Sequence, residues 1–126
     1  MEQLATGWHV ELTDRGPDWL FIRLHVDGDS YFEAPNIADR VWSVLQQHFV
    51  YRVVLEMEEV EFLSSHLIGQ LIMLQKRVLQ NGGALRLCGL SPSCQDVLRV
   101  CRVITILPAY ESRTDAVMGR GVAKPR

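Results

Sequence analysis

The sequence predicts an α/β domain with a mixed, mostly parallel sheet of four or five strands, led by an N-terminal hairpin, with helices packed on the sheet. Two observations carry this prediction. Residues 8–26 form two β-rich runs on either side of a turn, which is typical of a hairpin. After residue 30, segments with a helical spacing of apolar residues alternate with short aliphatic runs. Such alternation requires right-handed crossovers and therefore indicates parallel strands.

The first half of the chain supplies the hairpin, one helix and a central strand. Residues 8–14 and 19–26 are the hairpin strands, and residues 15–18 form the turn between them. From about Pro35 to His48 the apolar residues recur every three or four positions, which predicts a helix with the proline in its first turn. Residues 51–57 contain three consecutive aliphatic residues, as a strand covered on both faces does.

The second half continues the same alternation. An apolar stripe predicts a helix over residues 65–81, which ends at an Asn-Gly-Gly sequence, and a strand over 84–88 follows. A Ser-Pro pair at residues 91 and 92 caps a third helix. We expect a last short strand at 104–107 and a closing helical turn at 114–118.

Length and composition limit the function classes. The chain has 126 residues, of which 48% are hydrophobic, and a formal net charge of −2. We expect a single domain over residues 1–118 and a mobile tail over residues 119–126, which lack an apolar stripe. The small charge gives no reason to expect nucleic acid or anionic lipid as the main partner. We expect no membrane span, no signal peptide and a cytoplasmic location.

Residues 53–72 resemble the signature of the STAS family, named after sulfate transporters and anti-sigma factor antagonists. Residues 53–56 are similar to the family's aliphatic strand with an acid, and residues 60–63 to its short link. Residues 64–71 are similar to the helix start, which in the family reads Asp-Ser-Ser-Gly and continues Leu-Gly. Residues 81–92 are similar to the family's Gly-Gly turn, strand and Ser-Pro helix entry. The resemblance covers most of the chain beyond residue 35 and implies a STAS-like, protein-binding bacterial regulator.

The resemblance also implies a modification site. In antagonists of this family, the first serine after the aspartate is phosphorylated by a partner kinase that is itself the anti-sigma factor. That serine corresponds to Ser65, with Ser64 as the second choice. The chain departs from the family pattern at three positions, because Ser64 replaces the aspartate, His66 the second serine and Leu67 the first glycine. The partners that the resemblance implies are an anti-sigma factor serine kinase and a serine phosphatase.

The family's partner engages the start of the second helix. In this chain that region covers residues 58–70, and four carboxylates, at residues 56, 58, 59 and 61, lie just before the serines. The residues that we expect to bind the partner are Glu58, Glu59, Glu61, Ser64, Ser65, His66, Gly69 and Gln70.

Two functions remain open for the serine at the helix start. One is a binding switch, since a phosphoserine adds about −1.5 to −2 charges and the helix N-terminus tolerates an anion. The other is a constitutive scaffold or adaptor in a signalling or transport complex, with serine acting as a cap worth about 1 kcal/mol. The replacement of the family aspartate by Ser64 and of its second serine by His66 favours the scaffold.

Catalysis is the weaker hypothesis. Ser65 and His66 are adjacent and point about 100° apart on a helix, and the chain has no G-x-S-x-G sequence. We expect no catalytic residue, no metal and no cofactor, because paired His or Cys ligands and a glycine-rich phosphate loop are missing from the sequence. We expect the three cysteines to be small buried residues. The aromatic residues of the hairpin and first helix belong either to the core or to a surface for docking or homodimer formation.

Overall fold

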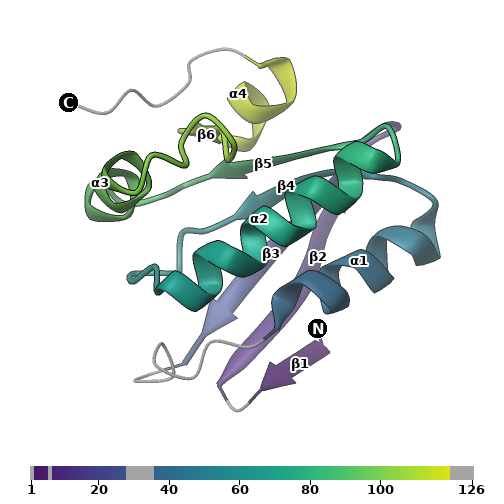
Figure 1. Cartoon of the computed structure of the whole chain (residues 1–126). Helices are drawn as coiled ribbons and strands as arrows, with labels where there is room; N and C mark the ends of the chain where they lie inside the picture. The colour runs from purple at the N-terminus through teal and green to yellow at the C-terminus, as the bar shows by residue number, and fades with distance from the viewer. Residues whose placement is uncertain (1, 6, 28–35, 120–126) are drawn as a thin grey trace.

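The computed structural model describes residues 2–5, 7–27 and 36–119, and these residues form one α/β layer structure (Figure 1). The described residues contain six strands and four helices. They are β1 (Glu2–Ala5), β2 (Trp8–Arg15), β3 (Leu20–Val26), α1 (Ile37–His48), β4 (Arg52–Glu56), α2 (Ser65–Gln80), β5 (Ala84–Cys88), α3 (Pro92–Val100), β6 (Ala109–Tyr110) and α4 (Arg113–Met118).

The strands form one mixed sheet in the order β1-β2-β3-β4-β5-β6. Strands β1, β2 and β3 pair antiparallel, whereas the pairs β3–β4, β4–β5 and β5–β6 are parallel. A tight turn closes the hairpin of β2 and β3, where the Gly16 N–H donates to the Trp19 carbonyl at 2.8 Å. The predicted fold class and the N-terminal hairpin are therefore confirmed.

Two strands differ from the sequence prediction. Strand β1, which was not expected, adds a sixth strand at the edge of the sheet. The predicted strand over residues 104–107 is wrong, because this segment forms a turn in which the N–H groups of Ile106 and Leu107 donate to the Val103 carbonyl at 2.9 and 2.8 Å. The chain reaches the sheet edge only after that turn, so β6 begins at Ala109.

Helix boundaries agree more closely with the sequence. Helix α1 begins at Ile37 after Asn36, and Pro35, which the sequence places in the first turn, lies outside the described residues. The closing helical turn is confirmed as α4, which ends at Gly119 in a left-handed cap. Residues 120–126 of the expected tail also lie outside the described residues.

The sheet is buried on both faces at its centre. Figure 1 shows α1 and α2 across one face, where the main core contains Val53, Leu55 and residues of α3 such as Leu98. On the opposite face, Val54 packs in a second cluster that α4 covers through Ala116. The continuous aliphatic run of β4 is explained by this double burial.

A buried polar network anchors α4 to the sheet. The Glu56 side chain, 3% exposed, accepts hydrogen bonds from Arg113 Nε and Nη2 at 2.9 and 2.6 Å and from Thr13 Oγ1 at 2.6 Å. Arg113 also bonds Asp14 at 3.1 Å, and its guanidinium lies over the Phe21 ring. Glu56 is the last residue of β4, so this network holds the end of the strand from which the link to α2 departs.

Candidate partner-binding site

The link between β4 and α2 is held by alternate apolar residues. Val60 and Leu63 are 1% and 3% exposed and anchor the link in the core, and the Val60 N–H donates to the Met57 carbonyl at 3.0 Å. The residues between these anchors face outward, with Glu61 exposed and Phe62 49% exposed. The link therefore presents a defined outer surface just before α2 begins.

The two serines at the start of α2 have different environments. Ser64 is the N-cap residue, and its Oγ accepts a hydrogen bond from the Leu67 N–H at 3.1 Å. Ser65 is the first helical residue, its side chain is exposed, and its hydroxyl makes no hydrogen bond within the described part of the chain. Capping therefore needs only Ser64 and leaves the Ser65 hydroxyl accessible.

The start of α2 is suited to carry an anion. The helix is 16 residues long and has no acidic residue in its first turn. The first backbone N–H groups of a helix point outward, and together with the helix dipole they attract negative charge. A phosphate on Ser65 would therefore lie next to favourable backbone groups of its own helix.

Gly69 lies on the same side of α2 as Ser65. Residues 65, 69 and 72 are spaced four and three positions apart, which places them along one side of the helix. A Cβ atom added at Gly69 would meet nothing within 4 Å. The fold therefore does not require a glycine at this position, and its lack of a side chain leaves the α2 backbone accessible from outside.

Two of the expected acidic residues contact basic side chains of β3. Glu58 lies 3.9 Å from Arg23, and Glu59 lies 2.7 Å from His25, which also contacts Glu11 at 2.7 Å. Glu61 is exposed and has no ion-pair partner among the residues that the structure describes. The sequence alone overstates the free negative charge near Ser65.

Gln70 is placed differently from the other expected binding residues. Its side chain is 9% exposed, and its Oε1 accepts a hydrogen bond from the Ala38 N–H at 3.0 Å. It therefore serves to join the first turn of α1 to α2. His66, one turn earlier, is exposed and lies beside Ser65 in the chain.

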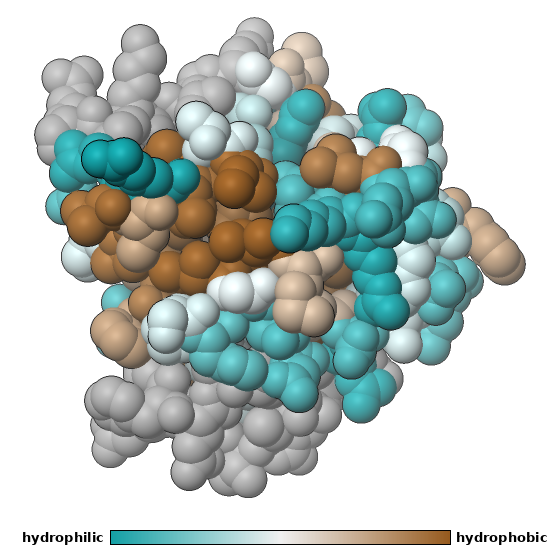
Figure 2. Space-filling view, viewed as in Figure 1, coloured by the Kyte–Doolittle hydropathy of each residue, from teal (hydrophilic) through white to brown (hydrophobic). Residues whose placement is uncertain are grey.

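An apolar patch that the sequence analysis missed lies next to the start of α2. Figure 2 shows hydrophobic side chains gathered over the space between α2 and α3. The half-buried apolar residues on these elements include Ile72 on α2, Val97 on α3 and Ile104 in the segment after α3. A sequence pattern does not separate fully buried apolar residues from partly buried ones, and the structure shows that Ile72 and Val97 are partly buried.

The cysteines do not form a ligand site. Cys88 and Cys94 are buried as expected, whereas the expectation is wrong for Cys101, which is exposed just after α3 ends. Burial, with smaller contributions from Glu58 and Glu56, raises the pKa of the Cys88 thiol to about 12, so it remains protonated. Across the described ranges, no group of three His, Cys, Asp or Glu residues could hold a metal ion. None of the described helices is both long and apolar enough to cross a membrane.

Known proteins that resemble this chain in sequence were found at the level of the family and of a single relative. Residues 16–116 match the family model described as the STAS domain. A curated relative from Bordetella bronchiseptica, BtrV, is named as an anti-sigma factor antagonist and is 31% identical over 75 residues. That match spans 60% of this chain and 65% of the relative, so the chain aligns with less than two thirds of the relative's length.

Two solved structures share the fold. A Thermotoga maritima protein named as an anti-sigma factor antagonist is 16% identical with a TM-score of 0.66, and the alignment covers 89% of this chain and 92% of that one. The Bacillus cell fate determinant SpoIIAA in its phosphorylated form is also 16% identical, with a TM-score of 0.56 and coverage of 89% and 97%.

Proposed function

Because the chain belongs to the STAS domain family, we propose that this anti-sigma factor antagonist-like domain binds a protein partner at the start of α2 and that phosphorylation of Ser65 switches the binding. The observation that carries the proposal is the division of roles between two adjacent serines. Ser64 satisfies the helix terminus, whereas Ser65 presents a free, exposed hydroxyl. Ser65 can therefore be modified without loss of the helix cap.

The proposed binding surface, which we call the α2-start surface, combines the link and the first two turns of α2. Its centre contains Ser65, His66 and Gly69, and its apolar side contains Phe62 and Ile72. Glu58, Glu59, Glu61 and Ser64 form its border on the link. An apolar area with a polar border is the usual composition of a protein-binding surface.

The switch would act on this surface by charge. A phosphate adds about −1.5 to −2 charges. The helix terminus stabilises this charge, so the fold is unaffected. A partner packed against Phe62 and Ile72 would have to desolvate the phosphate, and an acidic partner group would be repelled by it together with Glu61. Phosphorylation would therefore weaken binding without unfolding the domain.

The family supports the class of partner. BtrV is named as an anti-sigma factor antagonist, and SpoIIAA has a structure in a phosphorylated form. We infer that the partner is an anti-sigma factor with serine kinase activity and that a serine phosphatase restores the hydroxyl of Ser65. In this role the domain is a regulator rather than an enzyme, and it acts in the cytoplasm.

A constitutive scaffold is the second candidate. Two observations favour it: Ser64 occupies the position of the family aspartate, and its capping bond explains a serine there without any phosphorylation. In that case the same surface would bind a partner permanently.

The test compares the affinity of the co-purified anti-sigma factor for variants of the full chain. Ser65→Asp should weaken binding at least tenfold, whereas Ser65→Ala should bind like the wild type. Ser93→Asp is the matched control, since Ser93 is an exposed serine at the start of α3. Equal affinities for all the variants would refute the switch, and mass spectrometry of the protein from its native cell should find phosphate on Ser65.

A further inference from the structure

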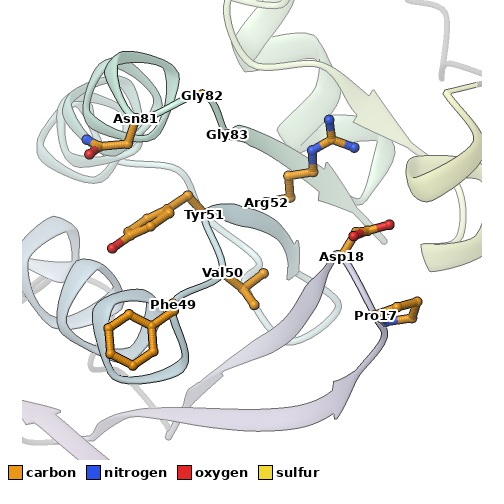
Figure 3. A pocket seen from close by; sticks show the side chains of 9 residues that line it. All are labelled: Pro17, Asp18, Phe49, Val50, Tyr51, Arg52, Asn81, Gly82 and Gly83. Atoms are coloured by element: carbon orange, nitrogen blue, oxygen red, sulfur yellow. The ribbon is translucent and has the colours of Figure 1, made fainter.

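A hollow lies at the opposite end of the sheet from the α2-start surface. It has a volume of about 370 Å³ and is bordered by the β2–β3 turn, the end of α1, the start of β4 and the turn after α2 (Figure 3). Asn81, Gly82 and Gly83 line it where α2 ends, whereas Ser65 is the first residue of that helix. The hollow is therefore about 24 Å from Ser65, the length of a 16-residue helix.

Phe49, at the edge of this hollow, has a backbone conformation and an exposure that are both unusual for a phenylalanine. It is the C-cap of α1 with φ 55° and ψ 33°, a left-handed conformation that glycine adopts most easily. Its side chain is nevertheless a phenyl ring, and it is 85% exposed. Neither the backbone conformation nor burial explains a phenylalanine here. Because strained backbone tends to persist where it serves a function, we take Phe49 as a candidate contact with another molecule.

Two opposite charges lie on the same side of the hollow. Asp18, in the β2–β3 turn, and Arg52, the first residue of β4, are both exposed and line the hollow. They form no ion pair with each other or with any other described residue. The contact of Arg52 within the chain is with the Trp19 ring, 5.9 Å from the guanidinium carbon.

We propose that this hollow and Phe49 form the contact surface of a symmetric homodimer. A two-fold axis places the same patch on both copies, so the patch must be complementary to itself. This patch carries an apolar ring and a hollow, and also a carboxylate and a guanidinium. In the dimer, Phe49 of each copy enters the hollow of the other, and Asp18 of each copy faces Arg52 of the other.

The dimer is compatible with partner binding and does not depend on it. Its surface lies at the C-terminal end of α2, so both α2-start surfaces remain open. Nine residues line the hollow, fewer than the roughly 20–30 residues a side of a standard interface. We therefore expect a weak dimer with a dissociation constant on the order of 10–100 μM.

The first experiment is analytical ultracentrifugation of the full chain from about 1 to 500 μM, a range that brackets the expected dissociation constant. The wild type should dimerise with increasing concentration. Phe49→Gly should raise the dissociation constant at least thirtyfold, roughly the effect of losing an aromatic hot spot. It should also raise the melting temperature of the monomer, because glycine relieves the backbone. Val100→Ser removes another exposed apolar side chain, 76% exposed on α3, and should leave dimerisation unchanged.

Variants that reverse the charge of Asp18 or Arg52 distinguish this specific dimer from nonspecific association. Asp18→Arg and Arg52→Asp should each weaken the homodimer, because like charges then face each other twice. An equimolar mixture of the two variants should form a heterodimer, and the double variant should dimerise like the wild type. A monomeric wild type over the whole range would overturn the proposal. So would single variants with wild-type affinity, or a monomeric chain whose Phe49 binds a different protein.

Discussion

The ion pair between Glu56 and Arg113 should contribute measurably to stability. Arg113→Met removes the two bonds at 2.9 and 2.6 Å but keeps the aliphatic packing. The Glu56 carboxylate would remain buried, with Thr13 as its hydrogen-bond donor. Arg23 Nε lies 3.7 Å from this carboxylate and makes no hydrogen bond within the described chain, so its positive charge could partly replace that of Arg113.

The size of the effect follows from these contacts. Removing one member of a buried pair costs about 3–5 kcal/mol. The side chain of Arg113 is 35% exposed and Arg23 stays close, so we expect a smaller loss than this, of about 2–3 kcal/mol. For a domain of this size, about 4 °C per kcal/mol gives a fall of roughly 8–12 °C in melting temperature.

A double-mutant cycle in urea at pH 7 tests whether the loss comes from this pair. Glu56→Gln should cost about 1–2 kcal/mol, because Arg113 keeps Asp14 as a partner. The double variant should lose at least about 1 kcal/mol less free energy of unfolding than the sum of the two single losses, since it leaves no unpaired buried charge. Single effects that add within about 0.5 kcal/mol would refute the direct interaction.

Four further predictions concern single positions. Ser64→Ala should lower the free energy of unfolding by about 1 kcal/mol in urea, because it removes the cap of α2. Gly69→Ala should stabilise the helix by about 0.5–1 kcal/mol yet weaken partner binding, whereas Gly83→Ala should unfold the domain, since its Cβ would overlap the Tyr51 carbonyl. The Cys88 pKa is raised from 9.0 to about 12, so the unfolded chain loses its thiol proton first, and the contribution of Cys88 to stability should be constant below pH 9 and fall above it. The loss should reach about 1.4 kcal/mol by pH 10, and Cys88→Ala should remove this alkaline dependence.

The parts of the fold that depend on local pattern could be predicted from the sequence. The extent of α2 followed from its apolar spacing and the Asn-Gly-Gly stop, and the start of α3 from the Ser-Pro pair. The strand prediction for residues 104–107 was wrong because a short apolar run fits a strand and a packed turn equally well. The conformation of this segment is set by distant contacts, including the bond from Gln75 Nε2 to the Ile106 carbonyl at 2.7 Å.

The candidate site could be located but not resolved in detail. The sequence placed two serines at a helix start, but which serine caps the helix depends on where the helical conformation begins, and a shift of one residue exchanges their roles. Gln70 was assigned to the binding surface because it lies in the segment that the family's partner engages. Its burial depends on α1, whose first turn lies 32 residues earlier in the chain. The exposure of Phe49 is equally invisible to a pattern that treats every apolar residue as core.

The two proposed surfaces should operate independently. They lie about 24 Å apart along α2, whereas charges in 0.1 M salt are screened over about 10 Å. A phosphate on Ser65 therefore has little direct electrostatic effect on Asp18 and Arg52, and the core between them is packed with buried residues that have one arrangement in this structure. The dissociation constant of the dimer should then be the same for the wild type and for Ser65→Asp. A dimer would present two separately switched α2-start surfaces, so a dimeric partner would bind with avidity that falls stepwise as each serine is modified.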